Sequence, residues 1–163
     1  MRELLAGHAT KSDAVESTQA ISGALLLSPK GAVLPGSKLE LELSALSSDR
    51  DRRDNFIKRS VLETSRYPNV EFVPKQAQGL DGLPPASGQV TFKLLGDATV
   101  HGVTKPMTWD VTAQCSGQGC NGTATSSFTL TEFGMTPPRI GPVLEVEDQG
   151  RLELRFQAAR SVA

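Results

Sequence analysis

Apolar and polar residues alternate along several stretches of the sequence, and this period of two constrains the fold more than any other feature. In residues 38–45, Leu39, Leu41, Leu43 and Ala45 alternate with polar side chains. Successive side chains of a β-strand point to opposite faces, so each such stretch predicts a strand with one apolar and one solvated face. Three other stretches place these residues on the apolar face: Val90, Phe92 and Leu94; Met107, Trp109, Val111 and Ala113; Leu152, Leu154, Phe156 and Ala158.

Further strands are predicted elsewhere in the chain. Residues 121–132 alternate threonines with small or apolar residues, which predicts a long strand whose threonines face solvent. Shorter strands are expected at residues 21–27 and 69–75, between turn-forming glycines and prolines. The sequence therefore predicts an all-β chain of about eight antiparallel strands. A single sheet of this kind buries its apolar face by curling into a barrel; a β-sandwich is the alternative.

Residues 49–66 interrupt the alternation and predict one or two short helices. Ser48 is followed three positions later by Asp51, as in a capping box, and acidic residues near a helix start are favoured by the helix dipole. The segment is expected to end at Tyr67 and Pro68, because proline disfavours helical geometry in the residue before it.

Composition excludes several classes of protein. The length of 163 residues fits one domain, spanning residues 1–163. The formal net charge of -1 lacks the positive excess of a nucleic-acid binder. No apolar run approaches the roughly 18–20 residues of a transmembrane helix. The first residues lack the apolar core and cleavage site of a secretory signal.

The two cysteines, Cys115 and Cys120, are separated by Ser-Gly-Gln-Gly. These turn-forming residues would place the cysteines opposite each other across a hairpin, within the reach of a disulfide. A disulfide would imply an oxidising compartment, whereas a pair of reduced thiols near a loop is the alternative. Two cysteines without histidine partners make a poor zinc site, and neither a metal nor another cofactor is expected.

Three blocks of sequence resemble the YceI-like family. The first lies within residues 46–73 and includes Arg53-Asp54-Asn55-Phe56-Ile57 and Arg66-Tyr67-Pro68. The second, residues 96–106, reads Gly-Asp-Ala-Thr-Val-His-Gly-Val-Thr-Lys-Pro. The third includes Glu132-Phe133-Gly134-Met135 and Leu152-Glu153-Leu154. The blocks occur in the family's order between strands of the right length, so we identify the chain as resembling this family from residue 23 to residue 158.

The resemblance implies an extended, lipocalin-like antiparallel barrel whose interior holds a long amphiphile, such as a polyisoprenoid, a quinone-like tail or a fatty-acid derivative. It also implies export to the periplasm or beyond. The chain departs from the family pattern at its start, where Arg2-Glu3-Leu4 resembles the end of a first strand. We therefore expect a truncated first strand and an unpaired sheet edge, and a cytoplasmic location stays open.

The apolar faces of the predicted strands are the candidate lining of a ligand cavity; a packed core is the alternative. Small residues at inward positions, among them Gly23, Ala45, Gly96, Ala124 and Ser126, predict an interior that side chains do not fill. The candidate lining residues are Leu25, Leu27, Leu39, Leu41, Leu43, Phe72, Val90, Phe92, Leu94, Met107, Trp109, Phe128, Leu130, Leu152, Leu154 and Phe156.

Arg50 and Arg53, in the predicted helical segment, are candidates for binding an anionic headgroup. The planar guanidinium group pairs well with phosphate or carboxylate. The alternative is a solvated helix whose arginines pair with Asp49, Asp51 and Asp54.

His101 precedes Gly102 and is expected in a turn, where hydrogen bonding of its side chain to backbone would explain it. The chain shows no nucleophile elbow, phosphate-binding loop or His-Glu-x-x-His pair. The leading hypothesis is therefore non-enzymatic binding, sequestration or transport of a long-chain amphiphile. The alternatives are an assembly module with a filled core, which would homodimerise through its incomplete first strand, and a catalyst that uses His101 or the carboxylates of residues 49–54.

Overall fold

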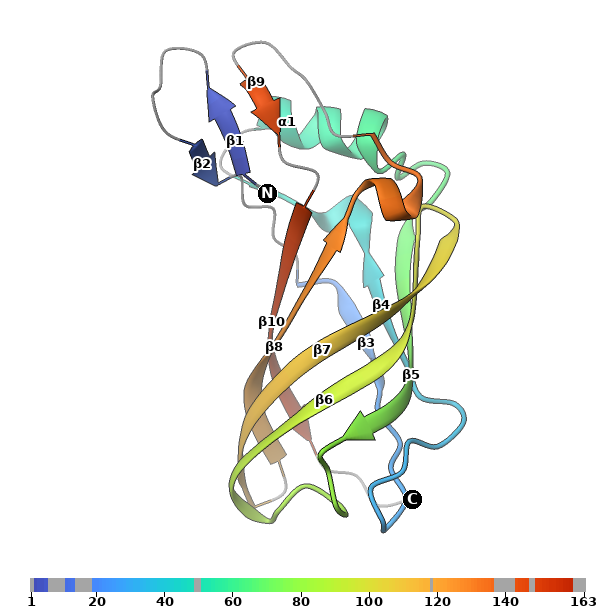
Figure 1. Cartoon of the computed structure of the whole chain (residues 1–163), viewed down its shortest axis with the longest axis vertical. Coiled ribbons are helices and arrows are strands. Elements are labelled where there is room, and N and C mark those ends of the chain that lie inside the picture. The colour runs from blue at the N-terminus through green and yellow to red at the C-terminus, as the bar shows by residue number, and fades with distance from the viewer. Residues whose placement is uncertain are drawn as a thin grey trace.

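Antiparallel strands form two sheets in the computed structural model, which describes residues 2–5, 11–13, 19–48, 51–117, 119–136, 143–146 and 149–159. The larger sheet is a curled half-barrel of seven strands (Figure 1). The smaller sheet lies at the end of the half-barrel that also carries the helix (Figure 1). This architecture confirms the predicted all-β, lipocalin-like antiparallel fold.

The strands have the following order in space. The larger sheet contains β10 (Gln149–Ala159), β8 (Gly119–Thr129), β7 (Val103–Ser116), β6 (Ser87–Val100), β5 (Asn69–Gln78), β4 (Lys38–Glu42) and β3 (Ile21–Ala24). The smaller sheet contains β2 (Lys11–Asp13), β1 (Arg2–Leu5) and β9 (Val143–Val146). The residues that resemble the end of a first barrel strand thus pair within the smaller sheet, as β1.

The larger sheet ends in two edges, β3 and β10. Within the described ranges no ladder joins these two strands, so the sheet is an open half-barrel. Its middle is regular: the ladder between β6 and β7 extends from the pair Ser87 and Ser116 to the pair Val100 and Val103. The curl brings one face of every strand to the inside, as the period of two predicts.

Three predicted strands end earlier than expected. The predicted strand 21–27 ends at Ala24, and Leu27 makes only an isolated bridge with Val33. A helical turn follows each of the other two. The predicted strand 38–45 ends at Glu42, and η1 (Leu43–Ala45) is a 3₁₀ turn in which the Leu46 amide donates to the Leu43 carbonyl. The predicted strand 121–132 ends at Thr129 and is followed by η3 (Thr131–Phe133). There the Glu132 carboxylate accepts hydrogen bonds from the amide and hydroxyl of Thr129, at 2.8 and 2.9 Å.

The predicted helical segment contains α1 (Asp51–Phe56) and a π-helical turn, η2 (Ile57–Val61). The sequence predicts that Ser48 pairs with Asp51 in a capping box; this is wrong, because the partner of Ser48 is a different aspartate. The amide and the hydroxyl of Ser48 both donate to the carboxylate of Asp54, which is buried, whereas Asp51 is exposed. In the described part of the chain, no helix has the length and apolarity that crossing a membrane requires.

Glycines on the inner face are covered by neighbouring groups. A Cβ atom at Gly96 would lie 2.8 Å from Cζ of Phe72, and one at Gly150 would lie 2.5 Å from Cζ of Phe128. At Gly23 a Cβ atom would meet the backbone of β4, and Ala45 is exposed in η1. The expectation that small inward residues leave empty space is therefore wrong at Gly23 and Gly96, because backbone or a ring approaches them closely, and at Ala45, because this residue is exposed in a turn.

We predict that Gly150→Ala lowers the free energy of unfolding by about 1–2 kcal/mol, because the added methyl group displaces the Phe128 ring. In a Phe128→Ala background the same change should cost little. A double-mutant cycle from urea denaturation should therefore give an interaction free energy of about 1 kcal/mol. Strictly additive effects would mean that the ring does not occupy this space.

Candidate functional site

The candidate lining residues fall into two groups by exposure. Six of them are buried: Leu43, Phe72, Phe92, Leu94, Met107 and Leu130. The others are half-buried: Leu25, Leu27, Leu39, Leu41, Val90, Trp109, Phe128, Leu152, Leu154 and Phe156.

The half-buried group lies mainly on strands near the two edges of the sheet. Leu39 and Leu41 belong to β4, and Leu152, Leu154 and Phe156 belong to β10. On the central strands β6 and β7 most inward side chains are buried. The inner face therefore offers partly exposed apolar surface along both sides of the open half-barrel. Surface of this kind binds apolar chains by removing hydrocarbon from water.

Trp109 lies on the inner register of β7 and is half-buried. It stands opposite Leu94 in the β6–β7 ladder, and its ring meets that of Phe72 edge to face, with centroids 6.3 Å apart. Its indole Nε1 is buried and has no hydrogen-bond partner among the described residues. The sequence places Trp109 in the lining but gives no sign that this donor is unpaired.

The two predicted headgroup ligands cannot be placed. Arg50 and the side chain of Arg53 lie outside the described residues. A cation that the sequence analysis missed, Lys105, lies on the inner register of β7 opposite Ala98 and is exposed. The same alternation that marks Met107 and Trp109 as inward also marks Lys105, so this residue was recognisable from the sequence.

His101 occupies the two-residue turn between β6 and β7. It has φ 53°, and Gly102 has φ 74°, as a tight hairpin turn requires. The expected bond of its side chain to backbone is wrong. Its ring Nε2 instead lies 2.5 Å from the Glu63 carboxylate, and the ring packs on Tyr67 with centroids 4.5 Å apart. This contact joins the segment after η2 to the β6–β7 hairpin. Because Glu63 and His101 are 38 positions apart, no local sequence pattern indicates the contact.

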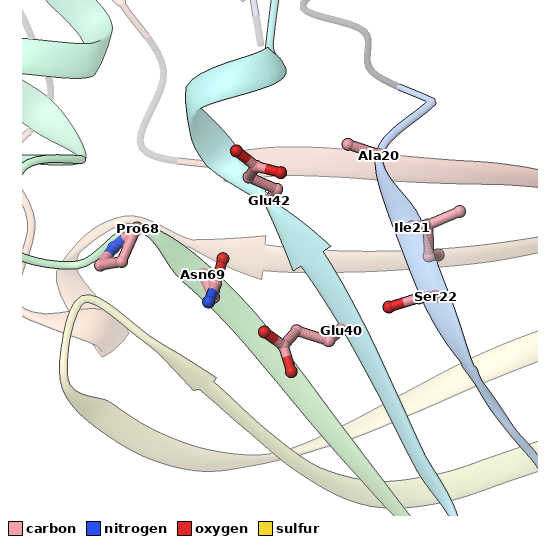
Figure 2. Close-up of a pocket in the computed structure, with 7 residues that line it drawn as sticks. All are labelled: Ala20, Ile21, Ser22, Glu40, Glu42, Pro68 and Asn69. Carbon is pink, nitrogen blue, oxygen red and sulfur yellow. The ribbon is translucent and has the colours of Figure 1, made fainter.

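Figure 2 shows a pocket on the outer face of the sheet, which the sequence analysis did not predict. Its volume is about 560 Å³, and its polar lining includes Glu40, Glu42 and Asn69. The Glu42 carboxylate accepts a hydrogen bond from the Ser44 hydroxyl at 2.6 Å. The pocket is separate from the apolar inner face, because these side chains alternate with inward Leu39 and Leu41.

A lysine beside this pocket already neutralises part of its charge. Lys38 lies 2.9 Å from the Glu71 carboxylate and 3.4 Å from that of Glu40. Its hydrogen bond to Glu71, and secondarily that to Glu40, raise the pKa of Lys38 above its ordinary value. The two ion pairs therefore balance part of the negative charge of Glu40 and Glu71 beside the pocket.

Cys115 and Cys120 are joined by a disulfide at the end of the β7–β8 hairpin. The two residues are direct partners in the ladder, and their Cα atoms are 4.0 Å apart. Of the two alternatives that the sequence left open, the structure thus has the bridge.

A model of the YceI-like domain matches residues 5–158 of this chain. The chain belongs to the YceI-like family. Relatives of this YceI-like chain include a UPF0312 protein of Pseudomonas savastanoi pv. phaseolicola, 29% identical over 131 residues. The match covers 75% of this chain and 61% of that relative, so the chain spans less than two thirds of the relative's length.

Solved structures share the fold of this YceI-like chain. The YCEI protein of Campylobacter jejuni superposes with a TM-score of 0.74 at 14% identity, over 95% of this chain and 90% of that one. A polyisoprenoid binding domain from Saccharophagus degradans, implicated in plant cell wall breakdown, superposes with a TM-score of 0.59 at 13% identity, over 82% and 74% of the two chains. At these identities the likeness concerns the fold.

The packing of Trp109 on the inner face predicts how its fluorescence responds to a quencher. Trp109 is the one tryptophan of the chain, so all indole emission reports on this position. We expect the folded protein to be quenched by acrylamide much less than the urea-unfolded chain, because the indole packs on the inner face. As a control, Trp109→Phe combined with Thr112→Trp moves the reporter to an exposed outward position and should restore quenching. Equal quenching of the two folded proteins would contradict the inward placement of Trp109.

Proposed function

We propose that this chain binds a long-chain amphiphile on the inner face of its half-barrel, and that it sequesters or transports this molecule without catalysing a reaction. Candidate ligands are polyisoprenoids, quinone-like lipids and fatty-acid derivatives. Their hydrocarbon tails match the apolar character of the inner face.

The half-buried apolar lining is the observation that carries this proposal. A filled core would bury the inward residues of every strand, whereas Leu39 and Leu41 on one side and Leu152, Leu154 and Phe156 on the other keep part of their surface exposed. Burial of a hydrocarbon chain against such surface contributes about 0.8 kcal/mol per methylene, offset in part by the cost of immobilising the chain.

The family gives independent support. The Saccharophagus degradans neighbour, which shares the fold, is a polyisoprenoid binding domain. A tail built of isoprene units is long, apolar and flexible, as is an acyl chain, and hydrophobic attraction is non-directional. The inner face alone therefore supports a class of ligand rather than one member of it.

The placement of His101 supports binding without catalysis. His101 is the one histidine among the described residues, and it lies in the turn between β6 and β7. Its ring is engaged by the Glu63 carboxylate and by Tyr67, so its hydrogen bond serves to hold two segments of the chain together.

The disulfide between Cys115 and Cys120 supports export to the periplasm or beyond, because such bonds persist in oxidising compartments.

Affinity should rise with the length of the ligand's apolar tail. In a homologous series of single-chain amphiphiles with one headgroup, we predict that Kd falls by up to about fourfold per added methylene until the inner face is filled. Trp109 emission provides the binding signal. A Kd independent of chain length, or no emission change with any member of the series, would remove the proposed function.

Two neighbouring residues of β10 provide matched variants for this titration. Leu154 faces inward and is half-buried, whereas Arg155 faces outward and is exposed. Leu154→Ala should weaken binding by roughly five- to tenfold, the loss expected for one buried branched side chain, and Arg155→Ala should leave Kd unchanged. Equal effects of the two variants would place the ligand elsewhere on the molecule.

The proposed compartment makes a prediction about thiol state. Protein taken from its natural host and quenched in acid should contain no thiol that reacts with a maleimide until a reductant is added, after which two thiols should react. The protein should also fractionate with a periplasmic or secreted marker. Reduced cysteines in a cytoplasmic fraction would contradict export.

A further inference from the structure

The buried indole N–H of Trp109 has no hydrogen-bond partner within the described part of the chain. Indole Nε1 can only donate, and buried tryptophans usually find an acceptor for it. A buried donor without an acceptor lowers the stability of the folded state by about 1–3 kcal/mol, so its retention needs a physical reason.

The backbone around Trp109 shows why the protein itself supplies no acceptor. The β7–β8 ladder begins at the pair Asp110 and Thr125, so Trp109 is the first residue of β7 beyond it. From this point on, β8 remains paired with β10 and β7 remains paired with β6. The strands β7 and β8 therefore move apart (Figure 1). The side chain of Ser126 lies at this fork; its hydroxyl donates to the Thr108 carbonyl at 2.7 Å and makes no hydrogen bond with the indole.

The surroundings of the indole are apolar. Its ladder partner is Leu94, its ring neighbour is Phe72, and Met107 and Val111 are the next inward residues of its own strand. A buried water needs two to four polar partners; these side chains provide none, and the Ser126 hydroxyl and the Thr108 carbonyl at the fork already bond each other. The acceptor that fits this position therefore belongs to a mainly apolar molecule.

The charge pattern indicates that this acceptor is neutral. Lys93 and Asp110 flank Leu94 and Trp109 in sequence, but they face outward and pair with each other at 2.7 Å. Lys105 is four residues away, about 13 Å along an extended strand. An anion next to the indole would thus be buried without a countercharge, which is costly.

We infer that the indole N–H of Trp109 donates a hydrogen bond to a neutral carbonyl oxygen of the bound ligand, and that this bond selects carbonyl-bearing amphiphiles from other molecules of the same shape. The inference rests on the proposed function, since it requires a ligand on the inner face. It adds a directional contact to an otherwise non-directional apolar surface.

A pair of isosteric ligands tests this directly. We would compare 2-dodecanone with 2-methyl-1-dodecene, in which a methylene group replaces the carbonyl oxygen. The two ligands differ in their transfer from water, so the test compares each ligand between two proteins. From wild type to Trp109→Phe, which keeps an aromatic ring but removes the donor, calorimetric titration should show the affinity for the ketone fall by roughly five- to tenfold while the affinity for the olefin is unchanged. Leu94→Met, a control opposite Trp109, should change the affinity of both ligands alike.

A measurement on the wild-type protein keeps the test independent of how well the variants fold. With one tryptophan in the chain, the ¹⁵N–¹H spectrum contains a single indole signal. The indole proton should move downfield when the ketone is added and should move less, or upfield, with the olefin. A ¹³C label on the ketone should show the matching downfield shift of its carbonyl carbon.

The outcomes separate the two proposals. If Trp109→Phe changes the affinity for both ligands by the same factor and the indole proton responds to both alike, the role of Trp109 is wrong while binding on the inner face stands. If neither these ligands nor the homologous amphiphiles bind, the proposed function fails, and the inference fails with it. A preference for the ketone that survives in Trp109→Phe would also overturn the inference, because another donor would then be responsible.

Discussion

The antiparallel pairing of seven curled strands is the constraint on which the other features of this protein depend. Pairing fixes the register, and the period of two then sends every second side chain to the inside. Leu94 stands opposite Trp109 and Leu39 opposite Phe72 for this reason. A shift of one residue in either ladder would exchange the apolar and polar faces. The apolar inner face is thus a consequence of the strand pairing itself and does not require a ligand.

A curled sheet with two unpaired edges within the described ranges has a particular energetic consequence. Its centre can bury apolar side chains against neighbouring strands, and Phe92, Leu94 and Met107 are buried there. Toward the edges each side chain has fewer neighbours, so Leu41 and Leu154 remain half-buried. The same geometry that stabilises the middle of the sheet therefore leaves apolar surface at its sides, and a hydrocarbon guest can cover that surface.

Alternation predicted most of the strands and their inward residues, and Gly102 indicated the turn at His101, because each of these is a local property of the sequence. Alternation failed where a helical turn continued an alternating stretch, at Leu43 and after Thr129. There the deciding interactions, such as the Glu132 carboxylate on Thr129, do not change the pattern of hydrophobicity. Contacts between distant segments, such as Glu63 with His101, and the covering of Gly150 by the Phe128 ring depend on tertiary packing and had no local signal.

The unpaired donor of Trp109 is another feature that depends on tertiary packing. A sequence shows that a tryptophan faces inward, but it does not show whether the indole N–H has an acceptor. Its position clarifies how a protein of this kind can distinguish ligands. Apolar contact contributes most of the binding free energy but scales with area and so selects mainly for tail length. One hydrogen bond contributes far less, yet it has direction, and a ligand without an acceptor leaves the donor unsatisfied. Under the proposed function, selection between ligands of equal length therefore depends on the few polar groups of the inner face, and on β7 the described ones include Trp109 and Lys105.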